Sequence, residues 1–187
     1  MKKLLLVAVM VLTSAISFAQ QKQGSLTIQP KVGLNIASLT DFDDSDPRFG
    51  VVAGAELMYQ ATDMVGLSFG ALYSMQGAKY DKATTKLDYI NIPILANVYV
   101  APGFAVKLGL QPGFNVNSKA KAKSNGVSVE ADLDAKTVDL SIPIGLSYEF
   151  SNFVIDGRYN WGVTKVAKDS DSKNSVFQIT LGYKLPL

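Results

Sequence analysis

Residues 137–150 read T-V-D-L-S-I-P-I-G-L-S-Y-E-F, and apolar and polar side chains alternate along them with a period of two. A β-strand sends successive side chains to opposite faces, so this stretch predicts a strand with two unlike faces. The apolar face carries Val138, Leu140, Ile142, Ile144, Leu146, Tyr148 and Phe150. The opposite face carries Asp139, Ser141, Gly145, Ser147 and Glu149. So long an alternation is hard to obtain by chance.

The same alternation recurs in seven other segments. They cover approximately residues 26–36, 53–60, 65–74, 87–100, 104–115, 153–164 and 175–185. Strands of about 10–14 residues are longer than the usual globular strand and match the length that crosses a bilayer at a tilt. The chain is therefore expected to form eight strands.

The connections between these segments fall into two classes. Short ones are predicted at Thr62-Asp63, Ala101-Pro102-Gly103 and Ser151-Asn152. Long polar ones run over approximately residues 38–48, 77–86, 118–136 and 167–174. Short and long connections alternate, as in an up-and-down barrel with tight periplasmic turns and long outer loops. An even number of strands also places both chain ends on the periplasmic side.

The composition of the two faces distinguishes a membrane barrel from a soluble, lipocalin-like one. One face is almost entirely Leu, Ile, Val, Phe, Tyr and Trp, whereas the other is rich in Gly, Ser, Asn, Thr and charge. The lumen of eight strands has room only for side chains, so the bulky face must lie outside, against lipid. The sequence predicts an all-β fold, an eight-stranded antiparallel up-and-down transmembrane β-barrel.

The opposite face then lines the lumen and brings charges into it. These are Lys31, Glu56, Lys107, Asp139, Glu149, Asp156, Arg158 and Lys184. Four cations with four anions favour a salt-bridged plug, because an unpaired buried charge is costly. Alternatively, some of them lie unpaired at wet barrel ends. Arg158 is expected to point inward and pair with Glu56, Asp139, Glu149 or Asp156.

The first residues have the three regions of a secretory signal peptide. Lys2 and Lys3 precede an apolar run of 13 residues and the segment Ser17-Phe18-Ala19. The run is too short for a transmembrane anchor, which needs about 20 apolar residues. We expect a signal peptide over residues 1–19 and one barrel domain over residues 20–187, since no linker divides the chain.

Charge and residue types exclude several classes of function. Without Lys2 and Lys3 the chain has 16 basic and 16 acidic residues, so no strong field attracts nucleic acid. The absence of His and Cys excludes disulfides, triads that use them, and metal sites built on imidazole or thiolate. Asp139 with Asp156 could act as acid and base, but salt bridging is the favoured role. We predict no enzyme, no catalytic or metal site and no cofactor.

Two loop segments carry dense charge. Residues 41–46 read D-F-D-D-S-D, an oxygen-rich run that could bind Ca²⁺, but Asp46 occupies the place of the glycine in an EF-hand loop. A solvated acidic loop is the favoured interpretation. Lys119, Lys121 and Lys123 could pair with Glu130, Asp132 and Asp134 as a charged hairpin around Asn125-Gly126. The alternative is a mobile loop.

The positions of the prolines and of the aromatic residues lead to two further predictions. Proline cannot donate a ladder hydrogen bond, so Pro30, Pro93, Pro112 and Pro143 are expected at β-bulges. Aromatic side chains on the lipid face are expected in two girdles. The periplasmic girdle would contain Tyr59, Phe104, Phe150, Phe153 and Tyr183, and the outer one Phe49, Tyr73, Phe114 and Phe177.

Two strands share a short motif: residues 88–94 read D-Y-I-N-I-P-I and residues 138–144 read V-D-L-S-I-P-I. Together with Ser17-Phe18-Ala19-Gln20 and Leu181-Gly182-Tyr183-Lys184-Leu185, they resemble the PorT-like group of outer-membrane β-barrel proteins. The chain departs from the usual aromatic ending, since it ends at Leu187. The resemblance implies an eight-stranded barrel, in some members part of secretion or gliding machinery.

These observations favour a non-enzymatic protein of the outer membrane of a Gram-negative bacterium, with a structural or accessory role. Its expected partner is outer-membrane lipid, and the long outer loops could contact a protein partner. A narrow channel or a small-ligand-binding barrel is the alternative, and a soluble periplasmic barrel is a third possibility.

Overall fold

The computed structural model describes residues 22–40, 46–79, 83–124, 127–133, 135–167 and 171–187. The predicted signal peptide, most of the acidic loop, and Asn125-Gly126 lie outside these residues. Eleven strands are described. They are β1 (Leu26–Leu39), β2 (Asp46–Gln60), β3 (Val65–Lys79), β4 (Ala83–Asn91), β5 (Ile94–Ala101), β6 (Phe104–Ser124), β7 (Val127–Asp132), β8 (Val138–Phe150), β9 (Phe153–Lys165), β10 (Lys173–Tyr183) and β11 (Leu185–Pro186). No helix within the described ranges is long and apolar enough to cross a membrane.

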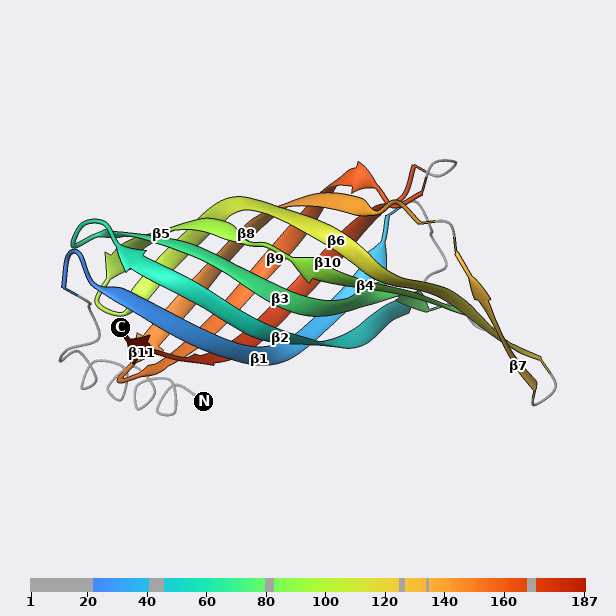
Figure 1. The fold of residues 1–187 in the computed structure, drawn as a ribbon, viewed down its shortest axis with the longest axis horizontal. Coiled ribbons are helices and arrows are strands. Elements are labelled where there is room, and N and C mark those ends of the chain that lie inside the picture. Colours follow the sequence, from blue (N-terminus) through green and yellow to red (C-terminus); the bar gives the residue numbers. More distant parts are fainter. Residues whose placement is uncertain (1–21, 41–45, 80–82, 125–126, 134, 168–170) are drawn as a thin grey trace, which may run out of the picture.

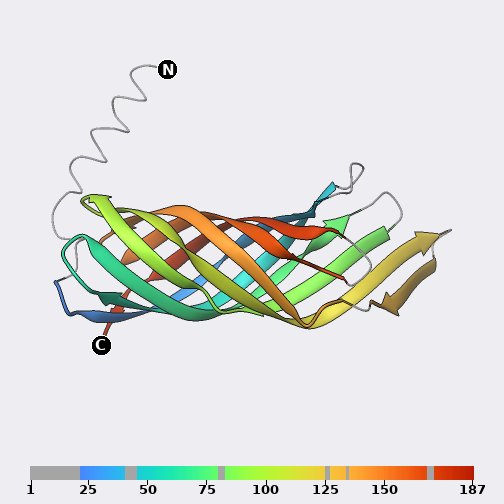
Figure 2. The ribbon, with the colours of Figure 1, turned by 90° about the horizontal axis from the view of Figure 1, so that it is seen from above.

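The strands close into one antiparallel barrel, as predicted (Figures 1 and 2). Consecutive strands pair around the sheet, with β4 and β5 forming a single wall strand, and β1 pairs with β10 to close it. The closing register runs from Lys31 opposite Gly182 to Leu39 opposite Asn174. Closure leaves no unpaired edge in the wall, which is the condition for a sheet to cross a bilayer.

The two faces lie where the alternation predicts. Along β1, Val32 and Leu34 are 56% and 59% exposed, whereas the flanking Lys31 and Asn35 are 4% and 0% exposed. The same alternation continues through β2, β3, β9 and β10. Most apolar side chains therefore cover the outside, and most of the buried side chains are polar or charged. A smaller buried apolar cluster contains Leu39, Ala78, Leu87, Tyr89 and Val166.

The predicted β-bulges at Pro30, Pro93, Pro112 and Pro143 are wrong. Pairing keeps one register on both sides of each proline; for example, Asn91 pairs with Gly113 before Pro93, and Ile94 pairs with Leu110 after it. At Pro93 the strand is divided into β4 and β5 but not shifted. Because proline has no N–H, it removes one hydrogen bond from the strand pairing. This loss does not require the extra residue that a β-bulge inserts. Register shifts occur elsewhere, as between Asp88 and Tyr89.

The predicted charged hairpin forms, but only part of its predicted charge pairing is found: Lys123 lies opposite Ser128, and Asp134 lies outside the described residues. β6 continues past the barrel wall and pairs with β7, with Lys119 opposite Asp132 and Lys121 opposite Glu130. This hairpin projects from the end of the barrel opposite the C-terminus (Figures 1 and 2). Since the short turns and β11 lie at the other end, the hairpin belongs to the outer side.

Aromatic side chains are exposed near both ends of the barrel. Phe153 lies 5.6 Å from Phe150 and 5.2 Å from Tyr183 between ring centroids, next to the Ser151-Asn152 turn. Near the outer loops, Ile36 pairs with both Phe49 and Phe177. A second outer row is formed where Ile90 pairs with Tyr73 and Phe114. This placement agrees with girdles at two membrane interfaces.

Candidate functional site in the barrel lumen

Five charged side chains from β1, β2, β6 and β9 meet in the middle of the lumen; we call Lys31, Glu56, Lys107, Asp156 and Arg158 the central cluster. Glu56 binds Lys31 through Oε2 at 2.6 Å and Arg158 Nη2 through Oε1 at 2.8 Å. Asp156 accepts from Arg158 Nε at 2.9 Å, lies 3.5 Å from Lys31 Nζ, and pairs with Lys107. Every member therefore has at least one partner of opposite charge.

Glycines on neighbouring strands make room for these long side chains. A Cβ atom added to Gly70 would lie 2.6 Å from Cγ of Glu56, and one added to Gly145 would lie 2.7 Å from Cβ of Arg158. At both positions the backbone carbonyl oxygen of the neighbouring strand is closer still, at 2.4 Å for Gly70 and 2.6 Å for Gly145, so glycine is required by the close approach of both backbone and charged side chain.

A second ion pair lies in the half of the lumen nearer the short turns. Lys184, between β10 and β11, donates to Glu149 Oε2 at 2.8 Å, and the Tyr99 hydroxyl donates to the other oxygen at 2.7 Å. Asp139, toward the outer end, accepts instead from the Thr164 hydroxyl at 2.7 Å. Within the described part of the chain no cation pairs with Asp139. The structure thus joins seven of the eight lumen charges in ion pairs and leaves Asp139 in a neutral network.

A third buried pair was missed by sequence reasoning. Arg48 of β2 lies 3.5 Å from Asp88 of β4 and also donates to the carbonyl oxygen of Gln76. Asp88 further accepts from the Tyr73 hydroxyl at 3.1 Å and from Asn117 at 2.9 Å. The sequence predicts an outer loop over approximately residues 38–48, whereas β2 begins at Asp46 and includes Arg48. The interruption of pairing between Pro47 and Val52 hides this extension from a period-two search.

Amides and hydroxyls fill the rest of the lumen. Many of their buried atoms, and Arg158 Nη1, have no hydrogen-bond partner within the described residues. The described residues contain no group of His, Cys, Asp or Glu suited to a metal ion. Polar side chains therefore line the lumen along its length, and ion pairs lie at its centre.

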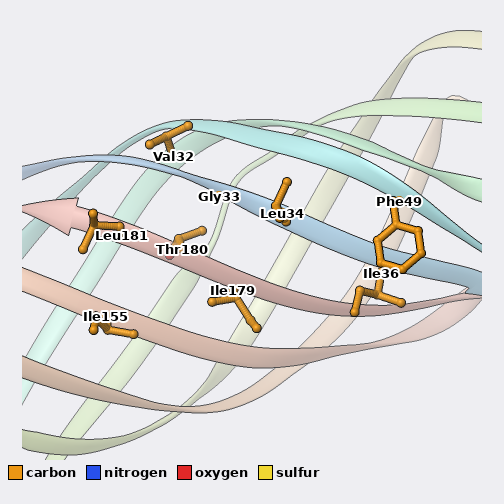
Figure 3. A pocket seen from close by; sticks show the side chains of 9 residues that line it. All are labelled: Val32, Gly33, Leu34, Ile36, Phe49, Ile155, Ile179, Thr180 and Leu181. Atoms are coloured by element: carbon orange, nitrogen blue, oxygen red, sulfur yellow. The ribbon is translucent and has the colours of Figure 1, made fainter.

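The outer surface contains a groove of about 460 Å³ between β1, β2, β9 and β10 (Figure 3). Val32, Leu34, Phe49, Ile179 and Leu181 are among its lining residues. Their side chains belong to the outward, apolar face, and Figure 3 shows them from three of these strands. Such a surface suits acyl chains.

The family comparison agrees with this geometry: a family described as "Outer membrane protein beta-barrel domain" matches residues 18–168. The chain belongs to this family. It is an outer-membrane β-barrel protein, placed in the lipid bilayer of a Gram-negative outer membrane. The narrower PorT-like group is not distinguished by this match. No curated protein sequence matches the chain.

Solved structures share the fold at low sequence identity. The attachment invasion locus protein Ail of Yersinia pestis has a TM-score of 0.53 and 18% identity, covering 87% of this chain and 99% of Ail. Neisserial surface protein A (NspA) has a TM-score of 0.56 and 18% identity, covering 86% of this chain and 97% of NspA. These likenesses support the small membrane barrel and carry no information about substrate or partner.

Proposed function

We propose that this protein is a non-enzymatic structural or accessory barrel of the outer membrane, of the PorT-like kind, whose lumen is closed by ion pairs. The observation that carries the proposal is the central cluster, in which three cations and two carboxylates from opposite walls meet at hydrogen-bonding distance. Ions crossing the lumen would have to break these pairs in a medium of low dielectric constant, which is costly.

The absence of an activity is part of the same proposal. The described lumen presents ion pairs, amides and hydroxyls, and the sequence contains no His or Cys to serve as base or nucleophile. We assign no cofactor and no nucleic acid. A protein partner would meet the outer side, where the β6–β7 hairpin carries paired charges beyond the barrel wall.

Export by a signal peptide over residues 1–19 belongs to the proposal too. Mass spectrometry of the protein purified from outer membranes should give a first residue of Gln20. An intact Met1 in the membrane-inserted protein would contradict cleavage after Ala19.

Single-channel recording in a planar bilayer tests the closed lumen. The wild-type barrel should show no steady current. The double variant Asp156→Ala with Arg158→Ala removes one charge of each sign from the central cluster and should conduct. The control, Glu149→Ala with Lys184→Ala, removes the periplasmic pair and should remain closed. A steady wild-type current would favour the narrow channel instead.

A further inference from the structure

The outer hairpin leaves one strand edge without a strand partner. β6 is paired on both sides beyond the barrel wall, where Lys119 lies opposite Lys86 of β4 and opposite Asp132 of β7. β7 pairs with β6 and with no other strand of the described chain. The sheet that projects from the outer end therefore stops at β7 (Figures 1 and 2), whereas the barrel wall closes on itself.

The register of the hairpin shows which backbone groups of β7 point away from β6. The Leu133 N–H donates to the Ser118 carbonyl oxygen at 3.1 Å, so Leu133 turns its backbone groups toward β6. Along a strand, the N–H and C=O groups of successive residues point to opposite sides. Ala131 therefore also faces β6, whereas Glu130 and Asp132 direct their N–H and C=O groups outward. Such an edge is a template for a further strand.

The side chains beside this edge make its two faces unlike. Glu130 and Asp132 project from one face, and Val129, Ala131 and Leu133 project from the other. The Glu130 side chain stays 40% exposed although two lysines contact it, and no ion pair joins Asp132 to a cation within the described residues. Val129 is 62% exposed. The edge is thus acidic on one face and apolar on the other.

The acidic face selects among the possible occupants of the edge. β7 reads V-S-V-E-A-D and contains neither the Pro nor the Lys that commonly protects an edge strand. A second copy of the chain does not fit, because residues directly opposite in an antiparallel pair share a face. Two β7 edges would therefore place carboxylates of both copies side by side, which is destabilising. Anionic lipid headgroups are repelled by the same carboxylates, whereas a strand with positive side chains is attracted.

From this edge we infer that β7 binds an extended segment of a partner protein as an added antiparallel strand. The segment carries Lys or Arg at alternate positions, opposite Glu130 and Asp132, and apolar side chains beside Val129 and Ala131. Backbone hydrogen bonds supply affinity in strand addition, and the alternating side chains supply specificity. The inference rests on the part of the proposed function that places a protein partner on the outer side, and it names the chemistry of that partner.

Peptide binding to the full-length protein tests the charge preference. The protein is refolded in nanodiscs of phosphatidylcholine, a lipid without net charge, and titrated with a short fluorescent peptide that alternates lysine with valine. A matched peptide with glutamate in place of lysine should bind more than about tenfold more weakly, because attractive cross-strand pairs become repulsive. Equal affinities, or no binding of the lysine peptide up to millimolar concentration, would overturn the inference.

Two methylated peptides of equal charge test strand addition itself. A peptide residue directly opposite Glu130 turns its own N–H toward β7. N-methylation of the lysine residues therefore removes the donors that face the edge and should abolish binding. N-methylation of the valine residues alters N–H groups that point away and should leave the affinity unchanged. If both methylated peptides bound equally well, the peptide would be held by charge alone and no strand would be added.

Amide hydrogen exchange followed by NMR locates the bound peptide without any variant. The lysine peptide should slow exchange at the N–H groups of Glu130 and Asp132. Exchange at Ala131 should change little, because its N–H already faces β6. Slowed exchange elsewhere on the barrel, with none at Glu130 and Asp132, would contradict the site.

A double variant and a control complete the test. Glu130→Gln with Asp132→Asn keeps the backbone edge and should weaken binding of the lysine peptide roughly tenfold, since two cross-strand charge pairs are lost. The control Asp171→Asn removes an exposed carboxylate that pairs with Lys165 outside the hairpin, and it should bind as the wild-type protein does. Equal weakening by the control would overturn the inference. None of these measurements uses a current, so a conducting barrel would refute the closed lumen and leave the edge site standing.

Discussion

Lysine meets carboxylate in two regions of this barrel, and the surroundings give the same contact different consequences. In the central cluster, Lys31 lies 2.6 Å from Glu56, and neither side chain is exposed. At the outer hairpin, Lys86 of the neighbouring β4 and Lys121 of β6 lie 3.2 Å and 3.6 Å from Glu130 of β7, with side chains 30–40% exposed. Water solvates either hairpin partner if the other is removed, whereas the lumen offers little such replacement. Removal of one charged partner should therefore destabilise the protein strongly in the lumen and only slightly on the hairpin.

The largest expected effect is that of Asp156→Leu. The substitution leaves three buried cations with Glu56 alone and should destabilise the barrel by about 3–5 kcal/mol. Urea unfolding of the refolded protein measures this loss. A destabilisation no larger than that of a hairpin variant would show that the lumen solvates charge well, and the comparison between the regions would fail.

A smaller loss is expected for Arg158→Leu. It leaves two cations and two carboxylates, so charge stays balanced, but Glu56 Oε1 and Asp156 Oδ1 each lose the donor found for them. Two unpaired carboxylate oxygens should cost about 1–3 kcal/mol in the same unfolding measurement. If this variant were less stable than Asp156→Leu, hydrogen bonding rather than charge balance would dominate the cluster.

Asp139 sharpens the comparison, because it is a lumen carboxylate without a cation partner within the described chain. Its Oδ1 accepts a hydrogen bond from the Thr164 hydroxyl, and the amide oxygen of an asparagine can accept the same hydrogen bond. Asp139→Asn should therefore change the free energy of unfolding by less than about 1 kcal/mol. The check is a direct comparison of its urea midpoint with that of Asp156→Asn, which should be much lower. Equal losses would mean that Asp139 has a charge partner.

The smallest effect is expected on the hairpin. The hydrogen bond from Lys86, and the charges of Lys86 and Lys121, lower the pKa of the Glu130 carboxyl. Any stability that follows is present above the ordinary carboxyl pKa and is lost as the pH falls through the lowered value. NMR titration should give a midpoint for Glu130 below that of a free glutamate peptide. Glu130→Gln should leave the unfolding midpoint unchanged at neutral pH, and a measurable loss would contradict the assignment of this pair to the solvated surface.

The sequence by itself determined the two faces of the wall. Alternation with a period of two depends only on the geometry of a strand. The narrow lumen of an eight-stranded barrel cannot hold the bulky side chains of every strand, so the bulky face lies outside. Strand number, the inward phase of Arg158 and eight of the buried charges followed from that rule, whereas the buried pair of Arg48 and Asp88 did not. The hairpin could also be anticipated, since Asn125-Gly126 lies between charged stretches of opposite sign.

Only the tertiary structure decided which lumen charges meet. The alternation predicts that Lys31, Lys107 and Asp156 point inward. Their position along the barrel axis depends on the register between strands that are distant in the sequence. That register places three cations with two carboxylates and leaves Asp139 apart. It also decided that the strand register does not shift at the prolines, and that β2 extends to include Arg48. Pairing between strands is a property of the closed barrel, so no single segment contains it.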